Sequence, residues 1–244
     1  GNNSVGWIVR SNTDIYADGA AYENGVAKTY DFCFRVYTAR SNDGTPYENQ
    51  LDDWLNMSGT DNLLQDTYPF YINDNGNYFG ITEAMRSRGL ANDVTYGGFL
   101  QSIEIKIDGN VAMRNPNMNM MRWNAYTLLT YGNKNLYWFT YWRPDSPGTP
   151  GSESYHNTPV DYNGTLLAKY SQIQTINSEI RNLGRTLKNL TSRRVYHEGP
   201  TIPGGTTLVP ADFFFKSDNV LNPVIEGYFT DANGRSYVMV TNRD

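Results

Sequence analysis

The chain has 244 residues, which suits one large domain or two smaller ones, so length alone selects no fold. Hydrophobic residues make up 39% of the chain and charged residues 18%, a balance that indicates a globular protein and excludes a disordered one. The formal net charge is -5. This charge argues against a nucleic-acid partner, because phosphate binding needs a clustered surplus of Lys and Arg.

Aromatic residues are frequent, at 14% of the chain, with 19 Tyr, 10 Phe and 5 Trp. Tyr and Trp combine a flat apolar face with a polar edge, which suits stacking on sugar rings. The same residues would also form an ordinary aromatic core. Composition leaves both interpretations open.

Cysteine and histidine are scarce. Cys33 lies in an apolar run, which favours a buried structural thiol over a nucleophile. His156 and His197 lie far apart and have no Cys or acidic neighbours at metal-ligand spacing, so we expect no metal and no cofactor. No stretch of about 18 apolar residues occurs, so we expect no membrane span. Residues 1–4 do not resemble the start of a signal peptide.

The first 60 residues carry mixed signals. Residues 5–10 form a short apolar run typical of a strand. Residues 22–37 have apolar positions at mixed helical spacing, and residues 42–46 supply turn chemistry. Residues 46–55 favour a helix.

Strands and helices alternate in the middle of the chain. Strands are predicted from β-branched and aromatic content, and helices from apolar periodicity. The predicted strands are 62–70, 94–102 and 135–142, and the predicted helices are 78–89, 117–131 and 169–190. Polar and acidic residues stand at the ends of these strands. This alternation is typical of a parallel α/β assembly whose site lies at the carboxyl ends of its strands.

The pattern changes after residue 198. Residues 199–205 are rich in Pro and Gly and indicate a linker, and helical periodicity is absent beyond them. Residues 225–229 and 236–240 are predicted to form a β-hairpin with an Asn-Gly turn. We therefore place a domain boundary between residues 198 and 199. Two strands alone are marginally stable, so we expect further chain to complete this second domain.

Several short motifs between residues 64 and 197 carry a family resemblance. They are Asp66-Thr67-Tyr68-Pro69-Phe70, Gly98-Phe99-Leu100-Gln101-Ser102, Arg114 with Pro116, Arg122-Trp123-Asn124-Ala125-Tyr126, Tyr131-Gly132, Tyr137-Trp138-Phe139-Thr140-Tyr141-Trp142, Asp161 with Gly164, Ile176-Asn177-Ser178-Glu179-Ile180 and Leu183-Gly184. This block resembles bacterial clan A glycoside hydrolase-like proteins, relatives of the family 42 β-galactosidase barrel. The match covers about half of the chain.

The resemblance implies an α/β fold. Residues 1–198 would be the C-terminal half of a TIM (β/α)8 barrel, strands five to eight, and residues 199–244 the beginning of an all-β sandwich domain. Strands one to four would lie outside this chain, which would then be a fragment. A half-barrel exposes sheet edges, so the chain is expected to associate with a missing N-terminal half or with another copy of itself.

The resemblance also implies glycosidic bond cleavage by two carboxyl groups. The acid/base would lie on strand four, upstream of Gly1, and the nucleophile at the end of strand seven. Gln101 stands there, and its neutral amide cannot be the nucleophile. Glu104 is the nearest acid, although its alternating isoleucine neighbours also fit a solvated strand. Asp66 is the better-placed catalytic candidate, and it would equally suit hydrogen bonding to loop amides or to a sugar hydroxyl.

Aromatic residues at the strand ends are candidates for substrate binding. Tyr68, Tyr141 and Trp142 would stack on a sugar, with Gln101 beside them, and Arg143 would bind hydroxyl groups or pair with an acid. Trp138 alternates with this set along the strand and should pack in the opposite direction.

Two functions are therefore predicted as alternatives. The first is a glycoside hydrolase acting on an oligosaccharide or polysaccharide, and the second is a non-catalytic sugar-binding or degenerate barrel. A structural module unrelated to sugars is a third interpretation. Both carbohydrate functions favour a secreted, periplasmic or cell-surface bacterial protein.

Overall fold

The computed structural model describes residues 47–73, 77–143, 153–219 and 221–243, together with four short strands before residue 47. The chain divides into two compact units, Gly1–Gln50 and Leu51–Asp244. The predicted division between residues 198 and 199 remains a prediction.

The first unit contains two small antiparallel pairings. Strand β1 (Ile8–Val9) pairs with β4 (Phe32–Cys33), and β2 (Ala21–Glu23) pairs with β3 (Val26–Lys28). The helical spacing read over residues 22–37 was therefore wrong where β2, β3 and β4 lie, because these residues form strands.

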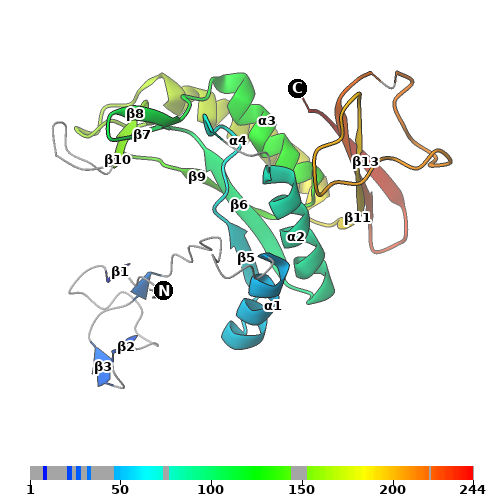
Figure 1. The fold of residues 1–244 in the computed structure, drawn as a ribbon, viewed down its shortest axis with the longest axis horizontal. Helices are drawn as coiled ribbons and strands as arrows, with labels where there is room; N and C mark the ends of the chain where they lie inside the picture. Colours follow the sequence, from blue (N-terminus) through cyan, green and yellow to red (C-terminus); the bar gives the residue numbers. More distant parts are fainter. Residues whose placement is uncertain are drawn as a thin grey trace. The chain divides into compact units, whose positions relative to one another are not determined.

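The second unit is built on a three-stranded parallel sheet (Figure 1). Its strands, in spatial order, are β5 (Asn62–Gln65), β6 (Thr95–Gln101) and β9 (Asn135–Phe139). The helices are α1 (Tyr47–Ser58), which begins in the first unit, α2 (Tyr78–Ala91), α3 (Met118–Thr130) and α4 (Ala168–Leu187). Helix α2 contacts β5 and β6, α3 contacts β6, and α4 contacts α3.

One face of the parallel sheet carries the main core. Leu100 of β6 is buried there against Met121 and Leu128 of α3 and Ile173 and Ile176 of α4. The apolar residues of α4 recur every three or four positions, so they form one stripe that buries against α3. This burial positions β6 and β9 relative to the three helices.

The other face of the sheet is more open. Leu64, Phe99 and Tyr137 lie on it, and the side chains of Leu64 and Tyr137 are exposed. Phe99 and Tyr137 are neighbours in the register, with ring centroids 5.8 Å apart. Parallel sheets usually cover both faces, so this partly open face is an unusual feature.

Two antiparallel sheets complete the second unit. Strand β7 (Glu104–Ile107) lies between β8 (Asn110–Met113) and β10 (Glu153–His156). The other sheet has the order β11 (Thr191–Glu198), β12 (Val224–Thr230) and β13 (Ser236–Asn242).

The sheet of β11, β12 and β13 packs closely on α3. A β-carbon at Gly227 would lie 2.1 Å from the carbonyl oxygen of Thr130, so only glycine allows this approach. The Thr130 and Thr241 hydroxyls are 2.6 Å apart, and Trp123 Nε1 donates to the Arg243 carbonyl at 3.0 Å. The sheet therefore belongs to the same compact unit as the helices.

The predicted fold class was wrong, because the described residues contain no half TIM barrel. They form four helices and three small three-stranded sheets, and two of these sheets are antiparallel. The expected fifth barrel strand, residues 5–10, is described only at Ile8–Val9, where it pairs antiparallel with β4. An antiparallel hairpin, β7 and β8, also separates β6 from α3. Alternation along the sequence predicted the helices and the parallel strands β5, β6 and β9, but not the antiparallel pairings of β1 with β4 and of β7 with β8.

The element predictions after residue 46 agree with the structure. Helices occur at all four expected places, the three expected parallel strands pair together, and the C-terminal hairpin is β12 and β13. Glu104 begins a strand, β7, whose hairpin with β8 was not predicted.

Glu226 is buried on β12, on the same sheet face as Glu198 of β11, because Glu226 pairs with Tyr196 in the register. Burial, reinforced by the neighbouring Glu198 carboxyl, raises the pKa of Glu226 to about 8. The folded protein therefore keeps this proton at pH values where the unfolded chain releases it. The stability that this proton confers is present at low pH and is lost as pH rises toward about 8.

Glu226→Gln should therefore raise the melting temperature more at pH 8 than at pH 5. In the wild type, the titration of Glu226 lowers the free energy of unfolding by at most about 1.4 kcal/mol per pH unit, and E226Q lacks this dependence. Thermal unfolding of both proteins across this range measures the difference. Asp212→Asn, at an exposed position, is the matched control and should leave the profile unchanged. A constant difference between wild type and E226Q at all pH values would contradict this assignment.

Candidate functional site

The carboxyl ends of β5, β6 and β9 define one edge of the parallel sheet. Ligand sites in parallel α/β sheets gather at this edge, because the segments that leave the strands there are free to diverge. Asp66, Ser102 and Thr140 are the first residues after the three strands. All seven candidate site residues follow or end these strands, which makes this edge the candidate site.

Gln101 is fully buried, and its side chain has a structural role. Its Nε2 donates to the carbonyl of Ile103 at 3.1 Å and to that of Arg114 at 2.8 Å. Both carbonyls flank the β7 and β8 hairpin, so the amide holds the hairpin to the end of β6. An amide is required here because a carboxylate has no hydrogen to donate.

The backbone of Gln101 is fixed from the helical side. Its N–H donates to Asn124 Oδ1 at 2.9 Å, and Asn124 Nδ2 donates to the Tyr78 hydroxyl at 2.7 Å. Burial raises the pKa of Tyr78 far above its ordinary value, so its hydroxyl stays protonated. These contacts connect α2 and α3 to the end of β6.

The two predicted catalytic acids lie on different segments. Asp66 is partly buried and follows β5, which ends opposite Gly98 and therefore three residues before the end of β6. Glu104 is the first residue of β7, pairs across the sheet with His156, and forms an ion pair with Lys106 at 3.5 Å.

Tyr68 is buried, with 4% of its surface exposed. Its ring lies 5.9 Å from that of Phe139 and packs in a cluster with Ile103 and Met113. Little of the ring is therefore available for stacking on a ligand.

Two aromatic pairs lie after β9 and at the start of α4. Trp142 stacks on Tyr162, with ring centroids 6.2 Å apart and an interplanar angle of 24°. Tyr141 meets Tyr170 edge to face, with centroids 6.3 Å apart. We call Tyr141, Trp142, Tyr162 and Tyr170 the aromatic surface.

The backbone around the aromatic surface is held in place by Val160. Its N–H donates to the Tyr141 carbonyl at 3.1 Å, and its carbonyl accepts from the Arg143 N–H at 3.2 Å. Tyr141, Trp142 and Tyr162 are exposed, at 59%, 42% and 41%. The predicted role of Trp138 in packing is confirmed, because this side chain lies against the core and its Nε1 donates to Asn177 Oδ1 at 2.8 Å.

Lys169 is a further candidate site residue, which the sequence did not indicate as one. It lies in the first turn of α4, is 8% exposed, and its Nζ donates to the Ser102 carbonyl at 2.5 Å. Burial lowers the pKa of Lys169 to about 8, and the charge of Glu104 opposes part of this shift. The sequence did indicate that Lys169 is buried. It lies four residues before Ile173 and seven before Ile176, on the same apolar stripe of the helix.

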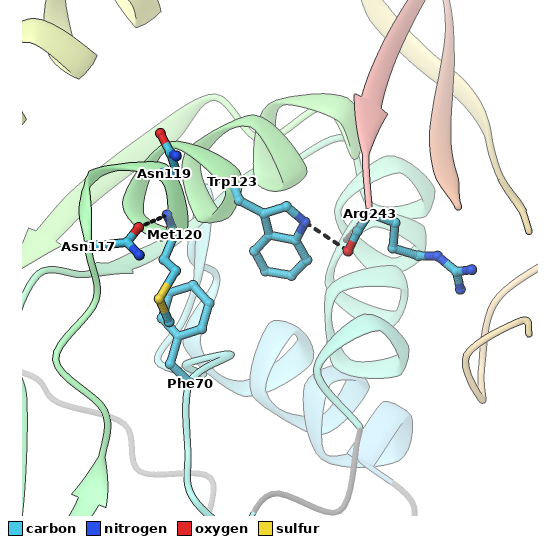
Figure 2. A pocket seen from close by; sticks show the side chains of 6 residues that line it. All are labelled: Phe70, Asn117, Asn119, Met120, Trp123 and Arg243. Carbon is cyan, nitrogen blue, oxygen red and sulfur yellow. Dashed lines mark hydrogen bonds between the residues drawn. The ribbon is translucent and has the colours of Figure 1, made fainter. Parts of the chain in front are cut away.

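A hollow of about 300 Å³ lies elsewhere, beside the N-terminus of α3 (Figure 2). Its polar groups already bind neighbours: Asn117 Oδ1 accepts from the Met120 N–H at 3.0 Å, and Asn119 Oδ1 accepts from Arg122 at 3.2 Å. The indole N–H of Trp123 binds the backbone of Arg243. These contacts make the hollow a weaker candidate than the sheet edge.

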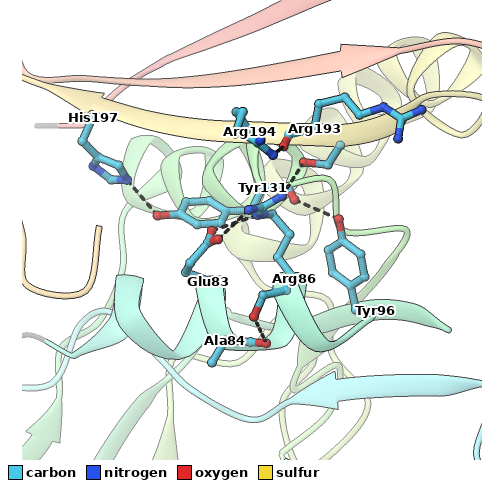
Figure 3. A network of polar contacts seen from close by, with 10 residues as sticks. Glu83, Ala84, Arg86, Tyr96, Tyr131, Arg193, Arg194 and His197 are labelled. Atoms are coloured by element: carbon cyan, nitrogen blue, oxygen red, sulfur yellow. Dashed lines mark hydrogen bonds and ion pairs between the residues drawn. The ribbon is translucent and has the colours of Figure 1, made fainter. Parts of the chain in front are cut away.

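A buried polar network connects α2, α3 and β11 (Figure 3). The Tyr131 hydroxyl lies 2.7 Å from His197 Nε2, the Tyr96 hydroxyl donates to the Tyr131 carbonyl, and Arg86 pairs with Glu83. Burial lowers the pKa of His197 to about 3, so the ring is neutral at physiological pH. These residues are enclosed between elements, and we assign them a structural role.

No known family profile matches the chain, and no curated protein matches it either. The resemblance to clan A glycoside hydrolases therefore stays a prediction based on the motifs alone.

The part of the chain that the structure describes contains no group of three or more His, Cys, Asp or Glu side chains arranged to hold a metal ion. Among the described helices, none has both the length and the apolar character that crossing a bilayer requires.

Gln101→Glu tests the structural role of this amide. The new carboxylate would face the carbonyls of Ile103 and Arg114, and we expect a loss of roughly 3 kcal/mol in the free energy of unfolding. Burial would raise the pKa of the introduced carboxyl, and its protonated form can donate one hydrogen bond. The defect should therefore be smaller at pH 5 than at pH 8 in urea unfolding experiments.

Gln174→Glu, on the exposed side of α4, makes the same chemical change without burial and should have little effect. If Q101E were as stable as Q174E, the hydrogen bonds of Gln101 would not hold the hairpin as described.

Proposed function

We propose that this protein binds oligosaccharides or polysaccharides at the aromatic surface. The exposed stack of Trp142 on Tyr162 carries the proposal, because large aromatic rings left open to solvent and held by a fixed backbone are typical of binding sites. A pyranose ring presents C–H groups that pack on such faces, while its hydroxyl groups bind polar neighbours at the rim.

Polar groups surround the aromatic surface. Arg143 follows Trp142 directly, and the phenol groups of Tyr141, Tyr162 and Tyr170 supply donors and acceptors. The Thr140 hydroxyl donates to the Trp142 carbonyl at 3.1 Å and so helps to fix the chain beneath the indole. A flat apolar face with hydroxyl groups at its edge matches a sugar better than a wholly apolar ligand.

Trp142→Ala should weaken oligosaccharide binding by about 10-fold or more, since removing a central aromatic contact commonly costs at least ~1.4 kcal/mol. The ligand is found first by screening a microarray of plant, bacterial and animal glycans, and its affinity is then measured by isothermal titration calorimetry. Trp142→Phe should retain part of the affinity, because it keeps an aromatic face.

Phe214→Ala is the matched control, because Phe214 is an exposed aromatic residue, 66% exposed, on the segment between β11 and β12. It should bind as the wild type does. Equal losses in W142A and F214A, or no glycan bound by the wild type, would reject the proposal.

Glycoside hydrolysis is the second candidate. Asp66 favours it, because this acid is partly buried and follows β5 at the edge of the sheet that holds the other site residues. Glu104 would be its partner, and hydrolysis requires carboxyl oxygens roughly 5 to 10 Å apart across the bound sugar.

Asp66→Asn and Glu104→Gln test this candidate, with aryl glycosides and the oligosaccharides found by the array as substrates. If the two acids act together, each change should lower kcat by at least about 100-fold while binding at the aromatic surface is retained. Asp93→Asn, an exposed acid after α2, is the control. The absence of turnover by the wild-type protein would leave binding as the function.

A secreted, periplasmic or cell-surface location accompanies either proposal, because polymeric saccharides are met outside the cytoplasm. Association with another copy or with a further segment is also proposed, and the partly open face around Leu64 and Tyr137 supports it.

A further inference from the structure

Lys169 lies in the first turn of α4, next in sequence to Tyr170 of the aromatic surface. Its Nζ binds the carbonyl of Ser102, whose own N–H donates to Phe139 and whose hydroxyl donates to Thr140, both at 3.0 Å. The ammonium group therefore lies where β6 and β9 end. The next residue along α4 is Tyr170, which contacts Tyr141.

The positive charge of Lys169 is poorly compensated. An ammonium group has three hydrogens to donate, and in the described structure its hydrogen bond is to one neutral carbonyl, that of Ser102. The first turn of a helix also disfavours a cation, because the helix dipole is positive there. Burial accordingly lowers the pKa of the Lys169 amine.

Nearby charged groups do not remove this imbalance. Glu104 of β7 acts on Lys169, but it also pairs with Lys106 at 3.5 Å and so divides its negative charge between two cations. His156 lies opposite Glu104 on β10, and Arg143 follows Trp142. Neither can contribute negative charge.

The geometry points to an acidic saccharide as the ligand, with Lys169 as the residue that selects its anionic group. This inference rests on the proposed carbohydrate-binding function and adds a ligand class to it. A carboxylate of a uronic acid or a sulfate ester would accept the remaining hydrogens of Nζ while the sugar ring lies on the aromatic surface.

The overall charge of -5 does not oppose this selection strongly. Charges farther away than about 8 Å are largely screened at physiological ionic strength, whereas a partly buried ammonium group is screened much less. Local charge at the site therefore determines which saccharides bind there.

The experiment compares saccharides that differ only in charge. The probes are oligogalacturonate and oligoglucuronate, each beside its methyl ester, and a sulfated galactan oligosaccharide beside its desulfated form. Calorimetry on the wild-type protein should show that at least one acidic form binds roughly 10-fold to 100-fold more tightly than its neutral partner. The pair of saccharides that shows this difference identifies the anionic group of the ligand as a carboxylate or a sulfate.

Lys169→Met should lower the affinity for the acidic form to that of the neutral form and leave the neutral form unchanged. Lys188→Met removes the same charge from the exposed C-terminal end of α4 and should change neither. The affinity of the wild type for the acidic form should also fall between pH 7 and pH 9, as the Lys169 amine loses its proton. Lys169→Arg should bind without that fall.

Several outcomes would overturn the inference. Equal affinity of the wild type for the acidic and neutral partners would reject charge selection while leaving the proposed function intact, provided that W142A still weakens binding. A parallel loss in K169M and K188M would reject the role of Lys169. If K169M does not fold, two other measurements test the role of Lys169. They are the affinities of the wild type for the acidic and neutral saccharides and the pH dependence of binding by K169R. Binding of no saccharide at all would reject the proposed function, and this inference with it.

Discussion

The hydrogen bonds of the Gln101 amide are the interaction on which the candidate site depends. They are made at the end of β6, where one buried side chain satisfies two carbonyl groups of the β7 and β8 hairpin. Asn124 fixes the same residue from α3. The free-energy cost of leaving a buried carbonyl without a donor is larger than the stabilisation from an exposed hydrogen bond. The contacts of Gln101 therefore strongly constrain the path of the chain.

The backbone conformation at Gln101 places the next residue, Ser102, within hydrogen-bonding distance of the end of β9 and of Lys169. Its backbone and hydroxyl bind β9 and Thr140, and its carbonyl accepts from Lys169. The aromatic surface follows within two residues of Thr140. The buried amide of Gln101 thus fixes the ends of β6 and β9. The aromatic and cationic groups of the proposed saccharide site follow directly from these strand ends.

Several features could be read from the amino-acid order. The helices α2, α3 and α4 follow from apolar residues at intervals of three and four, and the β12 and β13 hairpin follows from its Asn-Gly turn. Trp142 was predicted to bind a sugar because it is an aromatic residue at a strand end, and this role stays a prediction. Lys169 was not among the predicted site residues, although its place on the apolar stripe of α4 indicates burial.

The sequence by itself determined the helices of the second unit, its three parallel strands, the C-terminal hairpin and the buried side of α4, because local periodicity and turn residues encode them. Only the tertiary structure decided the remaining strand pairings, which are antiparallel and make the predicted half-barrel wrong: β1 pairs with β4, and β7 pairs with β8. It also decided the role of Gln101 and the burial of Lys169. Strand partners and buried polar contacts join residues distant in sequence, and their free energy depends on neighbours that no local pattern specifies.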